Sequence, residues 1–293
     1  MPRFVGRETE LRLLGRELDL VRKGIGGNHP GRCVLLRGRR RVGKSRLAEV
    51  FVERAGAPSL FFTASRQGDR EVHLFAEEVR GSDLPGADIF AETAPSTWDA
   101  GLRLLGQALP DDSVSIVVFD EFPYLVEDDR SIEATLQKQW DRILSRKPVL
   151  VLLIGSDIAT MEALNTHGRA LFQRGTEMAV PPLSPAETGE IVGAADAGDA
   201  FDAYLVTGGL PLICGEWPHG EPLWSYLAGG ALAGGGQVLP PAPSSRPSWL
   251  SASRAGTAGP RACTLWVMGT RPVNINDVLD GHVSLSVDCI DRL

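Results

Sequence analysis

The sequence predicts an α/β protein in which a doubly wound parallel sheet is followed by a partial small helical lid and an irregular C-terminal tail. Two observations predict this fold class. Short, continuously apolar segments, typical of strands covered on both faces, alternate along the chain with segments of helical periodicity. The first apolar segment is followed directly by the glycine-rich sequence GRRRVGKS at residues 38–45. In such a sheet the site lies at the carboxyl ends of the strands, so we expect the functional residues there.

Apolar periodicity and capping residues locate the individual elements. Leu11, Leu14 and Leu18 recur at helical spacing, and the sequence Ser184-Pro185-Ala186-Glu187 is typical of a helix start with a capping box. Helices are expected at about residues 8–22, 44–54, 69–80, 97–109, 132–145, 157–164 and 199–206, with one starting after Ser184 and a short one ending at 217. Strands are expected at about residues 32–37, 59–63, 114–119, 149–155 and 176–180.

The overall composition is that of a soluble globular protein. With 43% hydrophobic and 23% charged residues, the 293-residue chain can bury a large core as one domain or two. Its net charge of −7 argues against a general nucleic-acid-binding surface. The N-terminus has no apolar signal core, and the longest apolar segment, at residues 149–154, is too short to cross a bilayer. We therefore expect a cytoplasmic protein that does not interact with membranes.

Residues 38–45 match the pattern G-x-x-x-x-G-K-[ST] of a phosphate-binding loop. Gly38 and Gly43 allow backbone conformations in which consecutive N–H groups surround phosphate oxygens. Lys44 supplies a positive charge to the β- and γ-phosphates, and the hydroxyl of Ser45 is a ligand for Mg²⁺. The alternative is a glycine turn that carries a lysine by chance, but the strand before it and the amphipathic helix after it favour a phosphate loop. We expect ATP and Mg²⁺ here, with further nucleotide contacts from Arg39, Arg40, Arg41, Val42 and Arg46.

Two acids, Asp120 and Glu121, follow the buried-type strand at 114–119. At this position Asp120 can hold Mg²⁺, directly or through water, while Glu121 can activate the water that attacks the γ-phosphate. Any strand can end in solvated acids, and it is the phosphate loop upstream that favours the catalytic interpretation. Ser156 follows the next buried-type strand, where it would orient the attacking water or cap the following helix, or do both.

Six segments in this order resemble the archaeal-type ATPase family, a branch of the AAA+/STAND P-loop ATPases. They are FVGRETEL, GRRRVGKSRL, VVFDEFPYL, LIGSD, LFQRGTEMAVPPLSPAE and TGGLP, and together they cover about residues 3–217. The resemblance implies that Val5, Gly6 and Arg7 form the family's N-terminal box, which packs against the adenine side of the nucleotide.

Two further roles come from the resemblance alone. Arg174 matches an arginine that reaches the γ-phosphate in cis or from a neighbouring subunit; its alternative is a surface arginine, and Arg169 is a poorer match. Pro211 matches the proline that follows two glycines in a turn of the helical lid.

The resemblance ends near residue 228. We expect a P-loop ATPase core at 1–183, a partial helical lid at 184–227 and a low-complexity tail at 228–293. The tail is rich in Gly, Pro, Ser and Arg, lacks helical or strand periodicity and contains neither Lys nor Glu. It is interpreted either as a disordered tail or as the product of a frame shift that has truncated the winged helix usual in the family, and we favour the second interpretation. No nuclease or DNA-binding residues are transferred to this chain.

The leading functional hypothesis is a Mg-ATP-binding P-loop ATPase that acts as a nucleotide-dependent switch. One alternative is a nucleotide-binding module with little or no hydrolysis. A second is a small-molecule P-loop kinase, against which the adjacent acids Asp120 and Glu121 and the lack of an arginine-rich lid segment argue. A homo-oligomer or a protein partner is expected, and only the family resemblance suggests nucleic acid.

Overall fold

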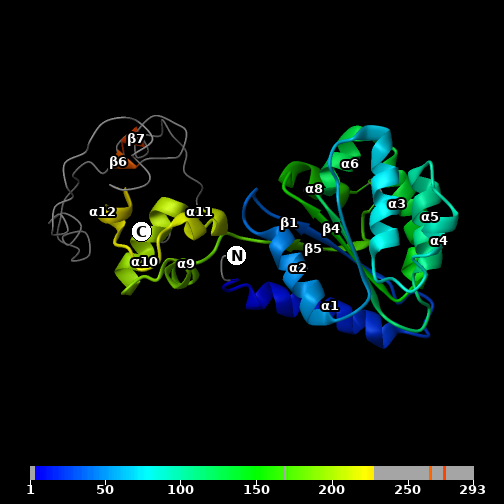
Figure 1. Cartoon of the computed structure of the whole chain (residues 1–293), viewed down its shortest axis with the longest axis horizontal. Helices are drawn as coiled ribbons and strands as arrows, with labels where there is room; N and C mark the ends of the chain where they lie inside the picture. The colour runs from blue at the N-terminus through cyan, green and yellow to red at the C-terminus, as the bar shows by residue number, and fades with distance from the viewer. Residues whose placement is uncertain (1–3, 168, 170, 228–263, 266–272, 275–293) are drawn as a thin grey trace. The chain divides into compact units, whose positions relative to one another are not determined.

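The computed structural model describes residues 4–167, 169, 171–227, 264–265 and 273–274. Within these residues a five-stranded sheet has the order β2-β3-β4-β1-β5, and every neighbouring pair in it is parallel (Figure 1). The strands are β1 (Arg32–Arg37), β2 (Ser59–Thr63), β3 (Ser115–Asp120), β4 (Val149–Gly155) and β5 (Gly175–Ala179). The predicted α/β class with a doubly wound parallel sheet is therefore confirmed.

Helices connect consecutive strands, as parallel pairing requires. Those of the sheet region are α1 (Glu8–Gly24), α2 (Lys44–Ala55), α3 (Glu71–Gly81), α4 (Ile89–Glu92), α5 (Trp98–Ala108), α6 (Phe122–Asp128), α7 (Ile132–Arg142) and α8 (Ile158–Leu164). Two single 3₁₀ turns, η1 (Gly68–Arg70) and η2 (Leu144–Arg146), complete this region. The short helices α4 and α6 were not predicted; the four residues of α4 are too few to show helical periodicity.

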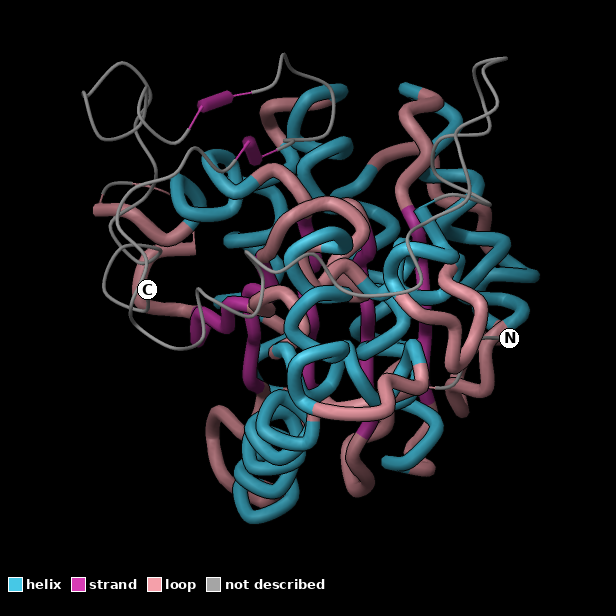
Figure 2. The backbone as a smooth tube through the Cα atoms, turned by 90° about the vertical axis from the view of Figure 1, so that its left-hand side faces the viewer, coloured by secondary structure: helices cyan, strands magenta, loops and turns pink. Residues whose placement is uncertain are grey.

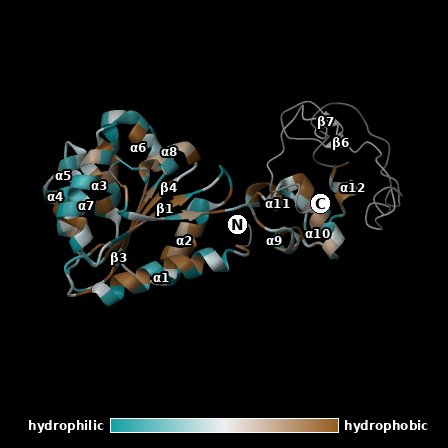
Figure 3. Cartoon of the chain, turned by 180° about the vertical axis from the view of Figure 1, so that it is seen from behind, coloured by the Kyte–Doolittle hydropathy of each residue, from teal (hydrophilic) through white to brown (hydrophobic). Residues whose placement is uncertain are grey.

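The sheet has a separate hydrophobic core on each face. Side chains alternate along a strand, so that in β1 Cys33 and Leu35 join one core while Val34 and Leu36 join the other. One core is completed by α3 to α8, and the other by α1 and α2. Figure 2 shows the strands side by side between helices, and Figure 3 shows that apolar residues dominate the strands. This double burial explains why the strands read as continuous apolar segments.

A third, smaller core is formed by the four helices that follow the sheet. These are α9 (Pro185–Val192), α10 (Ala197–Thr207), α11 (Pro211–Glu216) and α12 (Leu223–Tyr226). The buried apolar residues of this core are Leu183, Val192, Ala203, Cys214 and Trp217, and the Trp217 ring stacks on Tyr226 with 4.0 Å between ring centroids. The predicted capping box of Ser184 and Glu187 is present at the start of α9. We call α9 to α12 the lid.

Contacts divide the chain into one unit at residues 1–231, which holds the sheet and the lid, and a second unit at residues 232–293. In the second unit, β6 (Thr264–Leu265) pairs with β7 (Val273–Asn274) in antiparallel orientation. Most of the predicted tail lies outside the described residues, and the boundaries at 183 and 227 stay predictions.

The strand register brings the predicted site to one edge of the sheet. Arg37, the last residue of β1, pairs with Gly155 at the end of β4 and with Ala179 at the end of β5. The phosphate loop leaves this edge, and Ser156 follows Gly155 there. Asp120 is the last residue of the neighbouring β3. Segments far apart in the sequence therefore meet at the carboxyl ends of three adjacent strands.

Candidate nucleotide-binding site

The phosphate loop joins β1 to α2 and its lysine is folded onto the loop itself. Lys44 is only 5% exposed, and its Nζ donates hydrogen bonds to the carbonyl oxygens of Gly38 at 3.0 Å and Arg39 at 3.1 Å. Gly43, immediately before α2, has a φ of +91°, in the left-handed region that favours glycine. The first N–H groups of α2 have no acceptor within the helix, so the loop presents them together with the ammonium group. This arrangement fits a phosphate group.

Burial lowers the pKa of Lys44, and the neighbouring Glu121 and Asp120 carboxylates offset this effect in part. The charged ammonium group is therefore only partly compensated by the protein. Phosphate oxygens would supply the missing negative charge, because nearby charges of opposite sign are attracted strongly where water is largely excluded.

Asp120 is the buried acid of the site, with 5% of its surface exposed. Burial raises its pKa above the ordinary 3.8, while hydrogen bonds from the Ser45 hydroxyl and from the Glu121 amide lower it in part. The Ser45 hydroxyl therefore lies near the Asp120 carboxylate. Together they offer two oxygen ligands of the kind Mg²⁺ prefers, and the ion would remove the cost of the buried charge.

Glu121 has a different environment from Asp120. Its backbone is left-handed, with φ 52° and ψ 41°, and it forms the N-cap of α6. Its carboxylate accepts the hydroxyl proton of Ser156, with Ser156 Oγ at 2.9 Å from Oε2 and 3.2 Å from Oε1. The alternative role of Ser156 as an N-cap is filled by its neighbour, because Asp157 accepts the Thr160 amide at the start of α8. Ser156 is thus directed at the predicted catalytic acid.

The N-terminal box contacts the phosphate loop through Arg7. The Arg7 side chain is 4% exposed and donates from Nη2 to the carbonyl oxygen of Val42 at 3.0 Å and from Nη1 to that of Pro181 at 2.7 Å. Val5, two residues before Arg7, is also buried, with 7% of its surface exposed. The Arg7 side chain thus contacts the backbone of the phosphate loop, and the predicted contact with adenine stays a prediction.

The lid reaches the same loop through Pro211, the first residue of α11. A Cβ atom placed on Gly43 would lie 3.6 Å from Pro211 Cγ, which is ordinary van der Waals contact. The other arginines that are predicted to contact the nucleotide have exposed side chains; they are Arg39, Arg40, Arg41 and Arg46. Of these, Arg46 forms an ion pair with Glu49 at 2.9 Å on the outer surface of α2.

Arg174 lies at the amino ends of the strands, opposite to the end that carries the phosphate loop. It precedes Gly175, which pairs with Cys33 near the start of β1, whereas the phosphate loop follows the end of β1. A five-residue strand is about 16 Å long, so the backbone of Arg174 and the phosphate loop lie roughly that far apart along the strand direction. Arg174 instead makes a bidentate ion pair with Asp141 of α7, at 2.8 and 2.9 Å. This position does not favour contact with the γ-phosphate of the same chain, and the predicted contact in trans stays a prediction.

Strained backbone conformations coincide with the site. Among the described residues, the non-glycine residues with positive φ are Arg7, Arg41, Glu121, Arg66 and Gln173. The first three lie in the N-terminal box, the phosphate loop and the acidic turn after β3. Left-handed conformations of such residues cost free energy and persist where the surrounding structure fixes them, which is common at functional sites.

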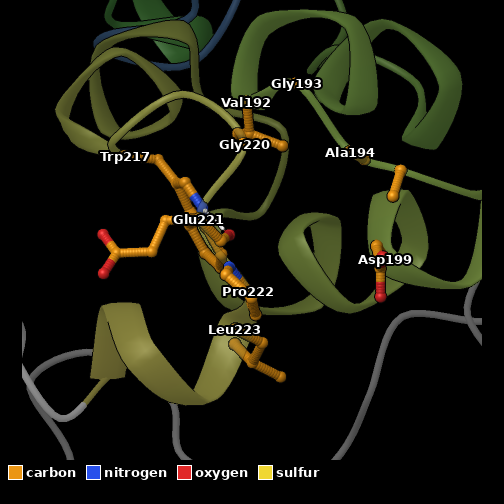
Figure 4. A pocket seen from close by; sticks show the side chains of 10 residues that line it. Val192, Gly193, Ala194, Asp199, Trp217, Gly220, Glu221, Pro222 and Leu223 are labelled. Atoms are coloured by element: carbon orange, nitrogen blue, oxygen red, sulfur yellow. Dashed lines mark hydrogen bonds between the residues drawn. The ribbon is translucent and has the colours of Figure 1, made fainter.

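The lid contains a small pocket that is separate from this site. It is lined by residues of the α9 C-terminus, the start of α10 and the segment before α12, including Val192, Trp217, Glu221 and Leu223 (Figure 4). None of the predicted site residues lines it. It therefore adds nothing to the nucleotide site.

Comparison with known proteins gives two curated relatives, both from Methanocaldococcus jannaschii, and no family model matches the chain. The uncharacterized protein MJECL04 is 25% identical over 233 residues, which are 76% of this chain and 46% of MJECL04. The chain thus spans about half the length of this relative. The uncharacterized protein MJ0424 is 32% identical over 92 residues, which are 30% of this chain and 79% of MJ0424. The chain belongs to the same family as MJ0424.

Solved structures that are similar to this chain show its fold. The Walker-type ATPase PABY2304 of Pyrococcus abyssi is 19% identical with a TM-score of 0.50, over 72% of this chain and 66% of PABY2304. The ORC2 protein of Aeropyrum pernix is 17% identical with a TM-score of 0.52, over 70% and 58% of the two chains. A Drosophila ORC chain, in a structure bound to DNA, is 16% identical with a TM-score of 0.50, over 64% and 46%. The fold is therefore that of the AAA+ P-loop ATPases.

This agrees with the predicted AAA+ fold, while the narrower archaeal-type branch and the truncation stay predictions. Among the described residues, no helix is both long and apolar enough to cross a membrane.

Proposed function

We propose that this protein is a P-loop ATPase that binds ATP with Mg²⁺ and acts as a nucleotide-dependent switch. The observation that carries the proposal is that three groups lie at the carboxyl ends of adjacent strands: the phosphate loop with Lys44 and Ser45, the buried Asp120, and the hydrogen-bonded pair of Ser156 and Glu121. The three groups have complementary chemistry, namely a cation for phosphate, oxygen ligands for a metal ion and a carboxylate for water.

Each group has a defined role in this proposal. Lys44 exchanges its hydrogen bonds to the loop carbonyls for bonds to the β- and γ-phosphates, and Ser45 and Asp120 hold Mg²⁺. The bound ion neutralises charge that develops on the phosphate oxygens. Glu121 accepts a proton from the attacking water, and Ser156 fixes the direction of the Glu121 carboxylate by its hydrogen bond.

Calorimetric titration of ATP with Mg²⁺ tests the binding step. Lys44→Ala should abolish detectable binding, because a phosphate loop without its ammonium group leaves the polyphosphate charge uncompensated. Lys138→Ala is the matched control, since Lys138 is 45% exposed and pairs with Asp99 away from the site. Equal ATP affinity in the parent and Lys44→Ala would contradict the proposal.

A nucleotide-binding module with little hydrolysis is the second candidate. The contact of Ser156 with both Glu121 oxygens favours it, because this contact engages the carboxylate that would accept the proton from water. A single-turnover measurement of phosphate release separates the two candidates, and adding small-molecule phosphate acceptors to it tests the third alternative, a kinase.

The partners follow from the same proposal. The position of Arg174 supports a homo-oligomer in which one subunit completes the site of the next. A protein that reads the nucleotide state is the alternative partner. Nucleic acid is proposed only because the similar Drosophila ORC structure is bound to DNA.

A further inference from the structure

Glu187 is a lid residue whose two carboxylate oxygens are used in different ways. Oε2 accepts the backbone N–H of Ser184 at 2.7 Å, which closes the capping box of α9. Oε1 accepts the backbone N–H of Arg7 at 3.3 Å, from the N-terminal box. A capping-box acid needs only the first contact, so the second requires another explanation.

Arg7 extends this contact to the phosphate loop. Its guanidinium group donates to the carbonyl oxygen of Val42, within the loop, and to that of Pro181, in the segment between β5 and α9. A continuous chain of hydrogen bonds therefore runs from the phosphate loop through Arg7 to Glu187 and into the first helix of the lid. These hydrogen bonds also contact both ends of the segment that connects the sheet to the lid, at Pro181 and at Ser184.

Gly6 shows how closely Glu187 approaches the N-terminal box. A Cβ atom at Gly6 would lie 2.0 Å from Glu187 Oε1, and Gly6 has a φ of +70°. Glycine is thus required at this position both by its backbone conformation and by the carboxylate next to it. Hydrogen bonds from Ser184 and Arg7 outweigh the effect of burial and hold the pKa of Glu187 below its ordinary 4.5, so the group is charged at neutral pH.

We propose that Glu187 is a positioning residue which, through Arg7, couples the phosphate loop to the lid. The inference rests on the proposed function, because the coupled event is the binding of ATP. When bound nucleotide orders the phosphate loop, the position of the Val42 carbonyl becomes fixed. Arg7 becomes fixed as well, because its guanidinium group donates to this carbonyl. The contact of Arg7 with Glu187 then stabilises the start of α9, so that nucleotide binding and lid order favour each other.

Two substitutions separate this role from helix capping. Glu187→Gln keeps the size of the side chain but replaces one of the two acceptor oxygens with an NH₂ donor. Because Ser184 and Arg7 donate to different oxygens, one of these two N–H groups would then face a donor. Ser184→Ala is the matched control, because it removes the Ser184 hydroxyl that accepts the Glu187 amide and leaves the contact with Arg7 in place. Both variants weaken the same helix terminus, and their melting temperatures should be similar.

The test compares hydrogen exchange at residues 185–192 with and without Mg-ATP, together with ATP affinity by calorimetry, on the full chain. In the parent and in Ser184→Ala, we expect ATP to slow exchange in α9. In Glu187→Gln, ATP should still bind, about tenfold more weakly, and the ATP-dependent change in α9 should be lost.

Two outcomes would overturn the coupling role. One is identical behaviour of Glu187→Gln and Ser184→Ala, which would make Glu187 a helix cap only. The other is an α9 that does not respond to ATP in a parent that binds it. In both of these outcomes the parent still binds ATP, so the proposed function stands. If the parent bound no ATP, the proposed function itself would fail, and the two failures are therefore distinguishable.

Gly6→Ala provides an independent check. Its methyl group displaces the Glu187 carboxylate and should reproduce the loss of the α9 response. In a Glu187→Ala background this clash is absent and only the backbone strain remains, so Gly6→Ala should weaken ATP affinity less than it does in the parent. Equal effects in both backgrounds would contradict a link between Gly6 and Glu187.

Discussion

Ser156 donates its hydroxyl proton to the carboxylate of Glu121, with Ser156 Oγ 2.9 Å from Oε2. The two residues are 35 positions apart in the chain. They meet because each directly follows one of two adjacent parallel strands, β3 and β4. This contact supports the proposed role of Ser156, since it involves the residue that would activate water.

Ser156→Ala should lower the rate of ATP hydrolysis by about fivefold and leave ATP affinity unchanged. The reason is that one hydrogen bond, worth about 1 kcal/mol, fixes the Glu121 carboxylate without touching the phosphate loop. Single-turnover phosphate release and calorimetry measure the two quantities. A faster rate in the variant would show instead that Ser156 restrains Glu121 from contact with water.

Glu121→Gln should have a larger effect on the same step. It preserves the size and hydrogen-bonding reach of the side chain but removes the carboxylate that accepts a proton. General-base assistance is worth roughly 10²–10⁴-fold, so hydrolysis should fall by about this factor while Mg-ATP binds with similar affinity. If the variant turned over at the parent rate, Glu121 would have no part in catalysis.

Asp120→Asn should weaken the dependence of ATP binding on Mg²⁺. Loss of a carboxylate contact worth about 1.4 kcal/mol would reduce the enhancement by Mg²⁺ tenfold. Titrating ATP into each protein with Mg²⁺ and with EDTA measures this enhancement. An equal effect of EDTA in parent and variant would exclude Asp120 as a magnesium ligand.

The raised pKa of Asp120 predicts a pH dependence with a definite sign. Its folded-state pKa lies above the ordinary 3.8, so the stability linked to its proton is present below pH 3.8 and is lost as pH rises through the folded value. At neutral pH the buried charge is a cost, and nucleotide-free Asp120→Asn should melt no lower than the parent. The affinity of the parent for Mg-ATP should fall as pH drops through the raised pKa. A variant that melts well below the parent at neutral pH would contradict this.

Arg174 should act on the nucleotide of a neighbouring subunit. Arg174→Ala and Glu121→Gln should each be nearly inactive, with a loss of about 10³-fold where an arginine acts in trans. An equal mixture should regain activity, because a Glu121→Gln subunit supplies Arg174 to the intact site of the other variant. Arg169→Ala mixed with Glu121→Gln is the control. Arg169 pairs with Glu133, which lies on the same helix, α7, as Asp141, the partner of Arg174. Absence of recovery, with subunits shown to exchange, would rule out action in trans.

The sequence by itself determined the elements that depend on local pattern. The phosphate loop requires two glycines, a lysine and a serine at fixed spacing, and the buried strands require continuous apolar segments. From these, the parallel α/β fold and the sheet edge that carries Asp120, Glu121 and Ser156 could be predicted. The capping box of Ser184 and Glu187 was predictable for the same reason, because its hydrogen bonds join residues three positions apart.

Only the tertiary structure decided the contacts between segments that are distant in sequence. It placed Arg174 beside Asp141 at the amino ends of the strands, because Arg174 precedes β5 and β5 runs parallel to β1. It also brought Glu187 to Arg7, 180 positions away, through a backbone N–H group that no side-chain pattern reveals. Such contacts depend on how the sheet and the lid pack, and this packing is determined by the whole chain.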